Sequence, residues 1–324
     1  MSKKCTIIMY HYVRDLKHTR YPEIKGLDLS LFYEQITYLE KNYSIIKMEQ
    51  LIDAIDNDAE LPPNACLLTF DDGYIDHYTN VFPFLEKKKL QGSFFLPVKT
   101  ALENEILDVN KIHFILANVA NKELIVQEIF QQLNEYRETY NLQSDEFYFK
   151  KLAVANRYDS ESIIFIKRML QVELPEIVRN AITDALFRKF VSADEKAFSR
   201  ELYMGIEQVE CMQRNGMHIG GHGNNHYWLG SLSKELQRIE LTESVKLVEK
   251  IGGNLDYWTM CYPYGNYNND TIDLLKELKC KAALTTEVDI AKVSDARRFE
   301  LARLDTNDIP KNGNAQVNDW FGKS

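Results

Sequence analysis

The sequence predicts an α/β fold, a βα barrel with a large helical insertion. Short apolar runs rich in β-branched and aromatic residues alternate with helical patterns near both ends of the chain, which is typical of repeated βα units and a parallel sheet. Over residues 102–212 the alternation stops, and apolar residues recur at helical spacing instead. The remainder, residues 1–101 and 213–324, is large enough for a barrel, which needs roughly 200 residues or more.

The first barrel part contains four predicted strands. Ser30 is expected to cap its first helix, because apolar side chains follow at one helical face. The buried strand ends in Asp71-Asp72-Gly73, a turn signal. The predicted strands are residues 5–12, 44–48, 65–70 and 92–98, and the later helices are residues 48–55 and 81–90.

Proline and glycine residues mark the predicted helix ends in the insertion and in the second barrel part. A helix is expected after Pro175, and Asn215-Gly216 marks the end of the last inserted helix. Gly252-Gly253 ends another helix, residues 233–251. The remaining predicted strands are residues 217–221, 257–262, 281–285 and 299–304, with a helix over residues 270–280.

Composition indicates an ordinary globular protein, with 45% hydrophobic and 27% charged residues, and it excludes a disordered chain. The formal net charge of −9 offers no obvious attraction to nucleic acid or anionic lipid. The cysteines are odd in number and contain no Cys-x-x-Cys pair, which favours reduced thiols. They are Cys5, Cys66, Cys211, Cys261 and Cys280.

The amino-terminal apolar stretch stops at His11 and Arg14, so it is too short for a secretory signal or a membrane span. No later segment approaches about 18 uninterrupted apolar residues. The sequence therefore predicts a cytoplasmic protein without a membrane span.

Polar residues follow four of the predicted strands. In βα barrels the loops after the strands converge on one mouth, so residues there are candidates for chemistry. We expect the four strand ends to lie together. They are Tyr10-His11, Thr69 to Gly73, His222 to His226, and Tyr262 to Gly265.

Asp71 and Asp72 form a pair of consecutive carboxylates directly after an apolar strand. Burying two like charges is costly unless a cation meets them, and a divalent metal ion would do so. Successive side chains point in different directions, so one carboxylate can bind the metal while the other faces its water. The alternative is an ordinary Asp-Gly turn with a solvated aspartate.

His222 and His226 are four residues apart, which allows both imidazoles to reach one metal ion. With one carboxylate they would make a three-ligand site with a position left for water. No Glu follows the first histidine, so this is not the zincin motif. Gly220, Gly221 and Gly223 favour a tight path from strand to loop. A structural or surface pair of histidines is the alternative.

Tyr262-Pro263-Tyr264-Gly265 resembles a rigid loop. Proline fixes one φ angle and glycine permits an unusual one, so the loop can aim a backbone N–H at a substrate oxygen. Taken alone, it is also compatible with a simple Pro-Gly turn.

Together these motifs resemble the polysaccharide deacetylase family, the NodB-homology group of carbohydrate esterase family 4, and more closely its poly-N-acetylglucosamine deacetylase-like branch. Thr69-Phe70-Asp71-Asp72-Gly73 matches the family's first motif in full, and His222 and His226 match the ligand positions of the second. The Pro263 loop is similar to the third motif. The resemblance implies a distorted (β/α)7-type barrel.

The resemblance also implies roles for these residues. Asp71 would be the general base, and the backbone N–H of Tyr264 would help bind the oxyanion. The expected cofactor is Zn²⁺ or another divalent transition metal, held by Asp72, His222 and His226. The residues expected to contact the substrate are Tyr262, Pro263, Tyr264 and Arg303.

Two departures from the family pattern concern the catalytic groups. Cys261 stands where many members carry an arginine that steadies the catalytic aspartate, and Arg303 is a candidate for supplying that cation from a late strand. The family's late histidine, its general acid, is absent because His226 is the last histidine. Relatives acting on poly-N-acetylglucosamine carry Tyr-His on an early strand, so His11 is the predicted acid. The alternative is a structural histidine at a strand end.

The predicted function is metal-dependent removal of an N-acetyl group from an N-acetylated amino sugar or glycan. One alternative is a deacetylase-like protein that binds a glycan or partner with little or no turnover, since Cys261 and the missing late histidine depart from the family. Another is a metal-dependent amidohydrolase acting on a non-sugar amide. The insertion is expected to act as a lid, a homo-oligomer surface or a docking site for a glycan-assembly partner.

Overall fold

The computed structural model describes residues 3–155 and 159–323; residues 1–2, 156–158 and 324 lie outside this description. The chain forms two compact units. The barrel unit comprises Met1–Asp15, Gly26–Asn104 and Arg200–Ser324, and the helical unit comprises Leu16–Lys25 and Glu105–Ser199. Every predicted site residue lies in the barrel unit.

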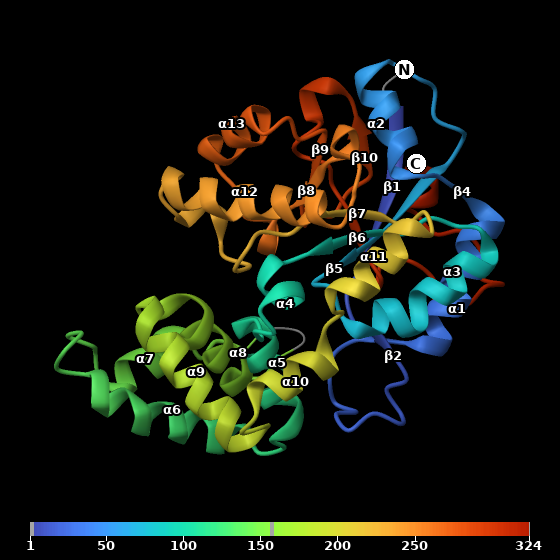
Figure 1. Ribbon diagram of the computed structural model, residues 1–324. Helices are drawn as coiled ribbons and strands as arrows, with labels where there is room; N and C mark the ends of the chain where they lie inside the picture. Colours follow the sequence, from blue (N-terminus) through green and yellow to red (C-terminus); the bar gives the residue numbers. More distant parts are fainter. Residues whose placement is uncertain (1–2, 156–158, 324) are drawn as a thin grey trace. The chain divides into compact units, whose positions relative to one another are not determined.

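The barrel unit is built on a nine-stranded sheet whose central strands are parallel (Figure 1). Strand β10 (Ala291–Val293) pairs antiparallel with β1, and β4 (Ser44–Ile45) pairs with β5. The parallel order is β1 (Lys3–Tyr10), β5 (Ala65–Asp71), β6 (Ser93–Leu96), β7 (His218–Gly221), β8 (Thr259–Cys261) and β9 (Ala282–Leu284).

A segment near the end of the chain joins the first and last strands of this parallel order, β1 and β9. Leu301 pairs with Leu284 of β9, and Leu304 in β11 (Leu304–Asp305) pairs with Ile8 of β1. Both pairings are parallel. The sheet therefore curls into a distorted barrel, and the predicted fold class is confirmed.

The hydrophobic core lies on both faces of the central strands, because these strands are buried on both sides. Every residue of β5 is buried, and because side chains alternate, Leu67 and Leu68 belong to different hydrophobic clusters. The cluster around Leu67 also contains Phe95 of β6 and Leu284 of β9. Strands that are not neighbours thus meet around one core, as a curled sheet requires.

Helices cover the outside of the barrel. The predicted face of α1 is buried, but Asp28 rather than Ser30 caps the helix, since its carboxylate accepts the backbone N–H of Ser30. Helix α12 packs on α13 and on β7 (Figure 1). The helices are α1 (Leu29–Asn42), α2 (Met48–Asp56), α3 (Phe82–Lys88), α4 (Val98–Leu102), α11 (Ile206–Arg214), α12 (Lys234–Lys250) and α13 (Asn269–Glu277).

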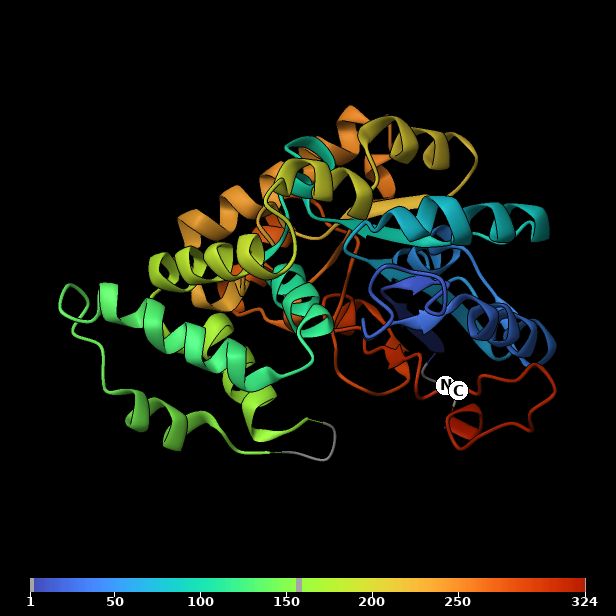
Figure 2. The ribbon, with the colours of Figure 1, turned by 90° about the horizontal axis from the view of Figure 1, so that it is seen from below.

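Two short features complete the barrel unit. Strands β2 (Val13–Arg14) and β3 (Leu27–Asp28) form a separate two-stranded sheet. The last helical turn, Phe321–Lys323, lies beside the start of β1, where the Lys4 ammonium donates to the Lys323 carbonyl at 2.6 Å (Figure 2).

The helical unit contains helices α5 to α9 and the first part of α10 (Glu195–Leu202), which lie between β6 and β7 in the sequence. Helix α9 begins directly after Pro175, and α5 packs on it through the buried ammonium of Lys111, which pairs with Asp184 and Glu195. The helices are α5 (Asp108–Asn118), α6 (Lys122–Tyr136), α7 (Asp145–Leu152), α8 (Glu161–Arg168) and α9 (Glu176–Phe190).

Across residues 3–155 and 159–323, no helix combines the length and the apolar character that a membrane crossing requires.

The end of β1 is held by a buried histidine. The Nε2 atom of His77 lies 2.8 Å from the carbonyl oxygen of His11, and a carbonyl can only accept, so Nε2 carries the proton. The ring packs against Phe70, Tyr74 and Phe94. Burial lowers the pKa of His77 to about 4.

We predict that His77 makes the fold sensitive to acid. With a folded pKa of about 4 against 6.5 for an ordinary histidine, the unfolded chain binds more protons between these values. The contribution is complete above pH 6.5 and is lost as the pH falls toward 4. Urea unfolding should lose roughly 2 kcal/mol between pH 7 and pH 5 through this residue.

His77→Gln is the matched control, because its amide can still donate to the His11 carbonyl but does not titrate. The loss of unfolding free energy between pH 7 and pH 5 should be smaller in this variant by about that amount. Equal losses in the two proteins would contradict the prediction.

Candidate active site

The predicted site residues meet where the parallel strands end. Asp71 is the last residue of β5, His222 follows β7, and His11 lies just after β1. The register pairs Tyr10 with Phe70, one residue before Asp71. Neighbouring parallel strands in register bring these side chains to the same edge of the sheet.

Asp72, His222 and His226 form a compact cluster of metal-ligating atoms. The Oδ1 atom of Asp72 lies 3.4 Å from Nε2 of His222 and 3.3 Å from Nε2 of His226. All three side chains are buried. Tetrahedral ligands at about 2.0–2.1 Å from a zinc ion lie about 3.3 Å apart, so these spacings suit a zinc-sized ion.

Neighbouring groups fix which atoms of this cluster face its centre. The hydroxyl of Tyr74 donates to Oδ2 of Asp72 at 2.6 Å, and Nδ1 of His222 donates to the carbonyl of Cys261 at 2.7 Å. Oδ1 of Asp72 makes no hydrogen bond of good geometry with any described residue, although it is buried. Two imidazole nitrogens and one otherwise unsatisfied carboxylate oxygen fit a divalent transition metal.

The three ligand candidates differ in how their neighbours shift their pKa values. Although burial opposes protonation, Cys261 and Asp72 raise the pKa of His222 well above its usual range. Burial alone would raise the pKa of Asp72, but the adjacent imidazoles of His222 and His226 hold that pKa well below its usual range. Burial lowers the pKa of His226, which favours the neutral imidazole that metals bind.

Asp71 is paired with Arg303. The guanidinium donates from two nitrogens to the two carboxylate oxygens at 3.0 and 2.8 Å, and it also donates to the carbonyl of Thr285 at 2.8 Å. Although burial opposes ionisation, this arginine lowers the pKa of Asp71 to about 2. The carboxylate is therefore ionised and held in one orientation.

Cys261 lies on the other side of Asp71, with its Sγ atom 3.4 Å from Oδ2. Burial raises the pKa of this thiol, so it is a neutral neighbour. Arg303 thus supplies, from the segment before β11, the cation that many relatives carry at the position of Cys261.

Two of the side chains expected to contact a substrate, those of Tyr262 and Arg303, are buried. Tyr262 is fully buried, and its hydroxyl donates to the carbonyl of Phe299 at 3.0 Å. Arg303 is also buried, and its donors are occupied by Asp71, Thr285 and Thr69. Both side chains thus make contacts within the fold, and the substrate-binding roles of Tyr262 and Arg303 stay predictions.

The Pro263 loop forms a tight turn at the mouth. Tyr264 has φ of 57° and Gly265 has φ of 67°, and a Cβ atom at Gly265 would lie 2.1 Å from Oγ1 of Thr286. Pro263 is buried, whereas Tyr264 is half-buried and places its ring against that of His226, with centroids 4.7 Å apart. The turn is therefore rigid and adjoins the predicted ligands.

His11 lies between Asp71 and solvent. Its Nε2 atom is 3.9 Å from Oδ2 of Asp71, and its side chain is 41% exposed. The structure thus brings His11, Asp71 and the three predicted ligands together.

Sequence reasoning missed two residues of this site, Tyr74 and Trp228. Tyr74 stands two positions after Asp72, and Trp228 two positions after His226. Proximity to a ligand in sequence was the only available signal, because aromatic residues in loops are equally common as core or surface residues.

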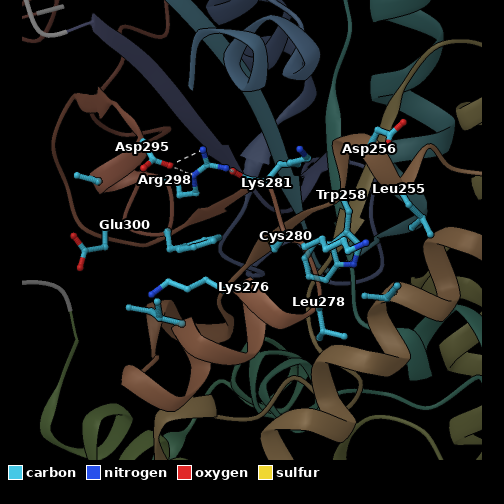
Figure 3. Close-up of a pocket in the computed structure, with 15 residues that line it drawn as sticks. Leu255, Asp256, Trp258, Lys276, Leu278, Cys280, Lys281, Asp295, Arg298 and Glu300 are labelled. Carbon is cyan, nitrogen blue, oxygen red and sulfur yellow. Dashed lines mark hydrogen bonds and ion pairs between the residues drawn. The ribbon is translucent and has the colours of Figure 1, made fainter. Parts of the chain in front are cut away.

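A separate pocket of about 960 Å³ lies at the opposite end of β8 and β9 (Figure 3). Its lining includes Trp258 and Lys281, which directly precede these strands. None of the predicted site residues lines it. This pocket is therefore not part of the candidate active site.

Comparisons with known proteins agree with the motifs. The family model described as polysaccharide deacetylase matches residues 174–283, which include His222, His226 and the Pro263 loop. No curated protein matches the chain.

Solved structures of low sequence identity share the fold. The Streptococcus pyogenes deacetylase PplD, in complex with acetate, is 18% identical, with a TM-score of 0.58 over 94% of this chain and 93% of that one. IcaB from Ammonifex degensii is 16% identical, with a TM-score of 0.54 over 95% and 94% of the two chains.

A de-N-acetylase from Aggregatibacter actinomycetemcomitans is also 16% identical, with a TM-score of 0.52 over 97% of both chains. The fold is thus shared along nearly the whole chain. The resemblance to the polysaccharide deacetylase family predicted from the motifs is therefore confirmed, by the family model over residues 174–283 and by the deacetylase fold of the chain.

Proposed function

We propose that this protein is a metal-dependent hydrolase that removes the N-acetyl group from an N-acetylated amino sugar within a glycan. The family and the fold support an enzyme acting on N-acetylated polysaccharide. The observation that carries the proposal is the pairing of two consecutive carboxylates with different partners. Asp72 faces two imidazoles, and Asp71 is held by Arg303.

Asp72, His222 and His226 would hold the metal ion, Zn²⁺ or another divalent transition metal. A bound ion of this kind lowers the pKa of water toward about 7 and polarises the acetamide carbonyl. The remaining catalytic tasks fall to the protein's own groups.

Asp71 is the proposed general base. It accepts a proton from the attacking water while Arg303 keeps the carboxylate ionised and oriented. The ion pair with Arg303 also lowers the basicity of Asp71. The fixed orientation of this carboxylate therefore contributes more to the proposed catalysis than its proton affinity does. The backbone N–H of Tyr264 donates to the oxyanion that forms on the acetamide oxygen.

His11 is the proposed general acid. In its protonated form it donates a proton from its imidazole to the departing nitrogen as the C–N bond breaks. Water and the N-acetyl sugar are thereby converted to acetate and a free amino sugar. The half-exposed position of His11 next to Asp71 supports this role.

The proposed substrate class is an N-acetylated glycan, in agreement with the family model. The PplD structure contains acetate, which is the product proposed here. The poly-N-acetylglucosamine branch stays a prediction from the motifs. We also propose that the chain consists of two barrel parts, residues 1–101 and 213–324, separated by an inserted helical region, residues 102–212. The cytoplasmic location and the role of the insertion as lid, oligomer surface or docking site stay predictions.

Acetate release from purified protein tests the proposed function. With Zn²⁺ present, the protein should release acetate from N-acetylglucosamine oligomers, and a chelator should abolish the release. Asp71→Asn should keep the metal but lose about 100-fold or more in kcat, because the base is removed and the ligand set is not.

The other outcomes discriminate between the alternatives. Metal and glycan binding without acetate release would indicate a non-catalytic deacetylase-like protein. Release of acetate only from non-sugar amides would indicate a different amidohydrolase. Full activity of Asp71→Asn would remove this residue from the mechanism.

The role of His11 is tested with two leaving groups. His11→Gln should lower the hydrolysis of N-acetylglucosamine oligomers about 100-fold, because the amine must be protonated to leave. Hydrolysis of 4-nitrophenyl acetate should change little, because nitrophenolate leaves without a proton. Equal losses on both substrates would show that His11 acts in another way.

Tyr74 is expected to orient Asp72 toward the metal. Tyr74→Phe removes the hydroxyl that holds Oδ2, so zinc affinity should fall about tenfold or more in a competition titration with a chelator. Tyr203→Phe is the control, since its ring stacks on Tyr74 with centroids 5.9 Å apart. Unchanged zinc affinity in Tyr74→Phe would contradict the prediction.

A further inference from the structure

Glu240 in helix α12 is a buried carboxylate that accepts three hydrogen bonds from one loop. Its Oε2 atom accepts the backbone N–H groups of Asn224 and Asn225 at 2.7 and 2.8 Å, and its Oε1 atom accepts the side-chain amide of Asn225. Glu240 is only 2% exposed. The two asparagines lie between His222 and His226, the predicted histidine ligands. A side chain outside the motif therefore holds the segment that joins these ligands.

The carbonyl groups of the same loop are held by a second element. The backbone N–H of Val98 donates to the Gly223 carbonyl at 3.1 Å, and that of Lys99 donates to the Asn224 carbonyl at 3.2 Å. Val98 and Lys99 are the first two residues of α4. Gly223 has φ of 76°, and a Cβ atom there would lie 3.0 Å from Oε2 of Glu240. The loop thus passes close to the carboxylate and is fixed through both its N–H and its carbonyl groups.

The two histidines differ in how their rings are oriented. Nδ1 of His222 donates to the carbonyl of Cys261 at 2.7 Å, as metal-bound imidazoles commonly do. Nδ1 of His226 is buried, and in the described part of the chain it has no hydrogen-bond partner. The His226 ring packs against Tyr264, with centroids 4.7 Å apart, and Tyr264 stacks on Trp228 at 4.4 Å. The orientation of His226 therefore depends on ring packing and on the backbone of its loop.

We infer that Glu240 is a positioning residue for His226. Its carboxylate fixes the loop that carries this imidazole, and so does for His226 what the Cys261 carbonyl does for His222. Burying a carboxylate is costly unless donors converge on it, and here all three donors belong to the loop between the ligands. The inference rests on the metal site of the proposed function but not on the hydrolysis of an acetamide.

The zinc affinity of Glu240 variants, measured by competition with a chelator, tests the inference. Glu240→Met leaves the backbone N–H groups of the loop without their acceptor, so the affinity should fall about tenfold or more. Glu240→Gln keeps one oxygen for both N–H groups, and a rotated Asn225 amide can accept its new N–H, so the affinity should stay within about threefold. Glu240→Asp keeps the charge but is one methylene group shorter, so it should lose affinity as Glu240→Met does.

Gln237→Met is the matched control. Gln237 is buried on the same helix, one turn before Glu240, and its side chain also makes three hydrogen bonds, with Leu232, Asn268 and Thr271. Both methionine variants should lower the free energy of unfolding of the metal-free protein in urea, but only Glu240→Met should lose zinc affinity. Equal zinc affinity in Glu240→Met and the unmodified protein would mean that Glu240 only stabilises the fold, and would overturn the inference.

If Glu240→Met does not fold, the comparison of Glu240→Asp with Glu240→Gln decides. Equally tight zinc binding by these two variants would overturn the inference, whereas weaker binding by Glu240→Asp alone would support it. Failure of the proposed function is recognised separately, as zinc binding without acetate release by the unmodified protein, and the zinc titrations still decide the role of Glu240 in that case. Absence of zinc binding by the unmodified protein would overturn the inference together with the metal site.

Discussion

Two neighbouring carboxylates at the end of a buried strand are the constraint on which this structure depends. Asp71 and Asp72 are both buried, and burying two like charges side by side is strongly unfavourable without compensation. A different set of neighbours compensates the charge of each carboxylate. One carboxylate meets a guanidinium, and the other meets two imidazoles placed to share an ion with it. The parallel register of β5, β6 and β7 makes this arrangement possible, since it brings distant loops to one edge.

Much of the fold was predictable because it depends on local patterns. The buried strands β5 and β7 and the helix after Ser233 follow from apolar runs and capping residues, and these signals lie within a few positions of one another. The cap of α1 was assigned to Ser30, although Asp28, two positions earlier, caps the helix by accepting the N–H of Ser30. Strand β10 was missed, because three residues with one exposed side chain give little periodicity.

The clustering of Asp72, His222 and His226 was predictable, but the contacts that support the candidate site were not. Asp72, His222 and His226 are recognisable from residue type and spacing, and the motif gave their association. The burial of Tyr262 and the hydrogen bonds of Tyr74 arise only from tertiary packing, which a single sequence does not encode locally. Arg303 was recognised as a source of charge, yet only the tertiary structure shows that its guanidinium pairs with Asp71.

Residues with positive φ angles occur in the candidate active site. Asp72, His226 and Tyr264 all adopt positive φ angles of 74°, 60° and 57°. Each such conformation costs about 1–2 kcal/mol for a residue with a side chain. Strain of this kind persists where the surrounding structure over-determines it, and here it lies at two predicted ligands and at the turn beside them.

The segment that closes the barrel also carries the partner of Asp71. Leu301 and Leu304 pair with β9 and β1, and Arg303 lies between these two residues in the sequence. A ribosome makes Asp71 first and Arg303 only 232 positions later. The nascent chain therefore holds an aspartate without its counter-ion until the segment that closes the barrel has been synthesised. The carboxylate proposed as the general base gains its fixed orientation only together with closure of the barrel.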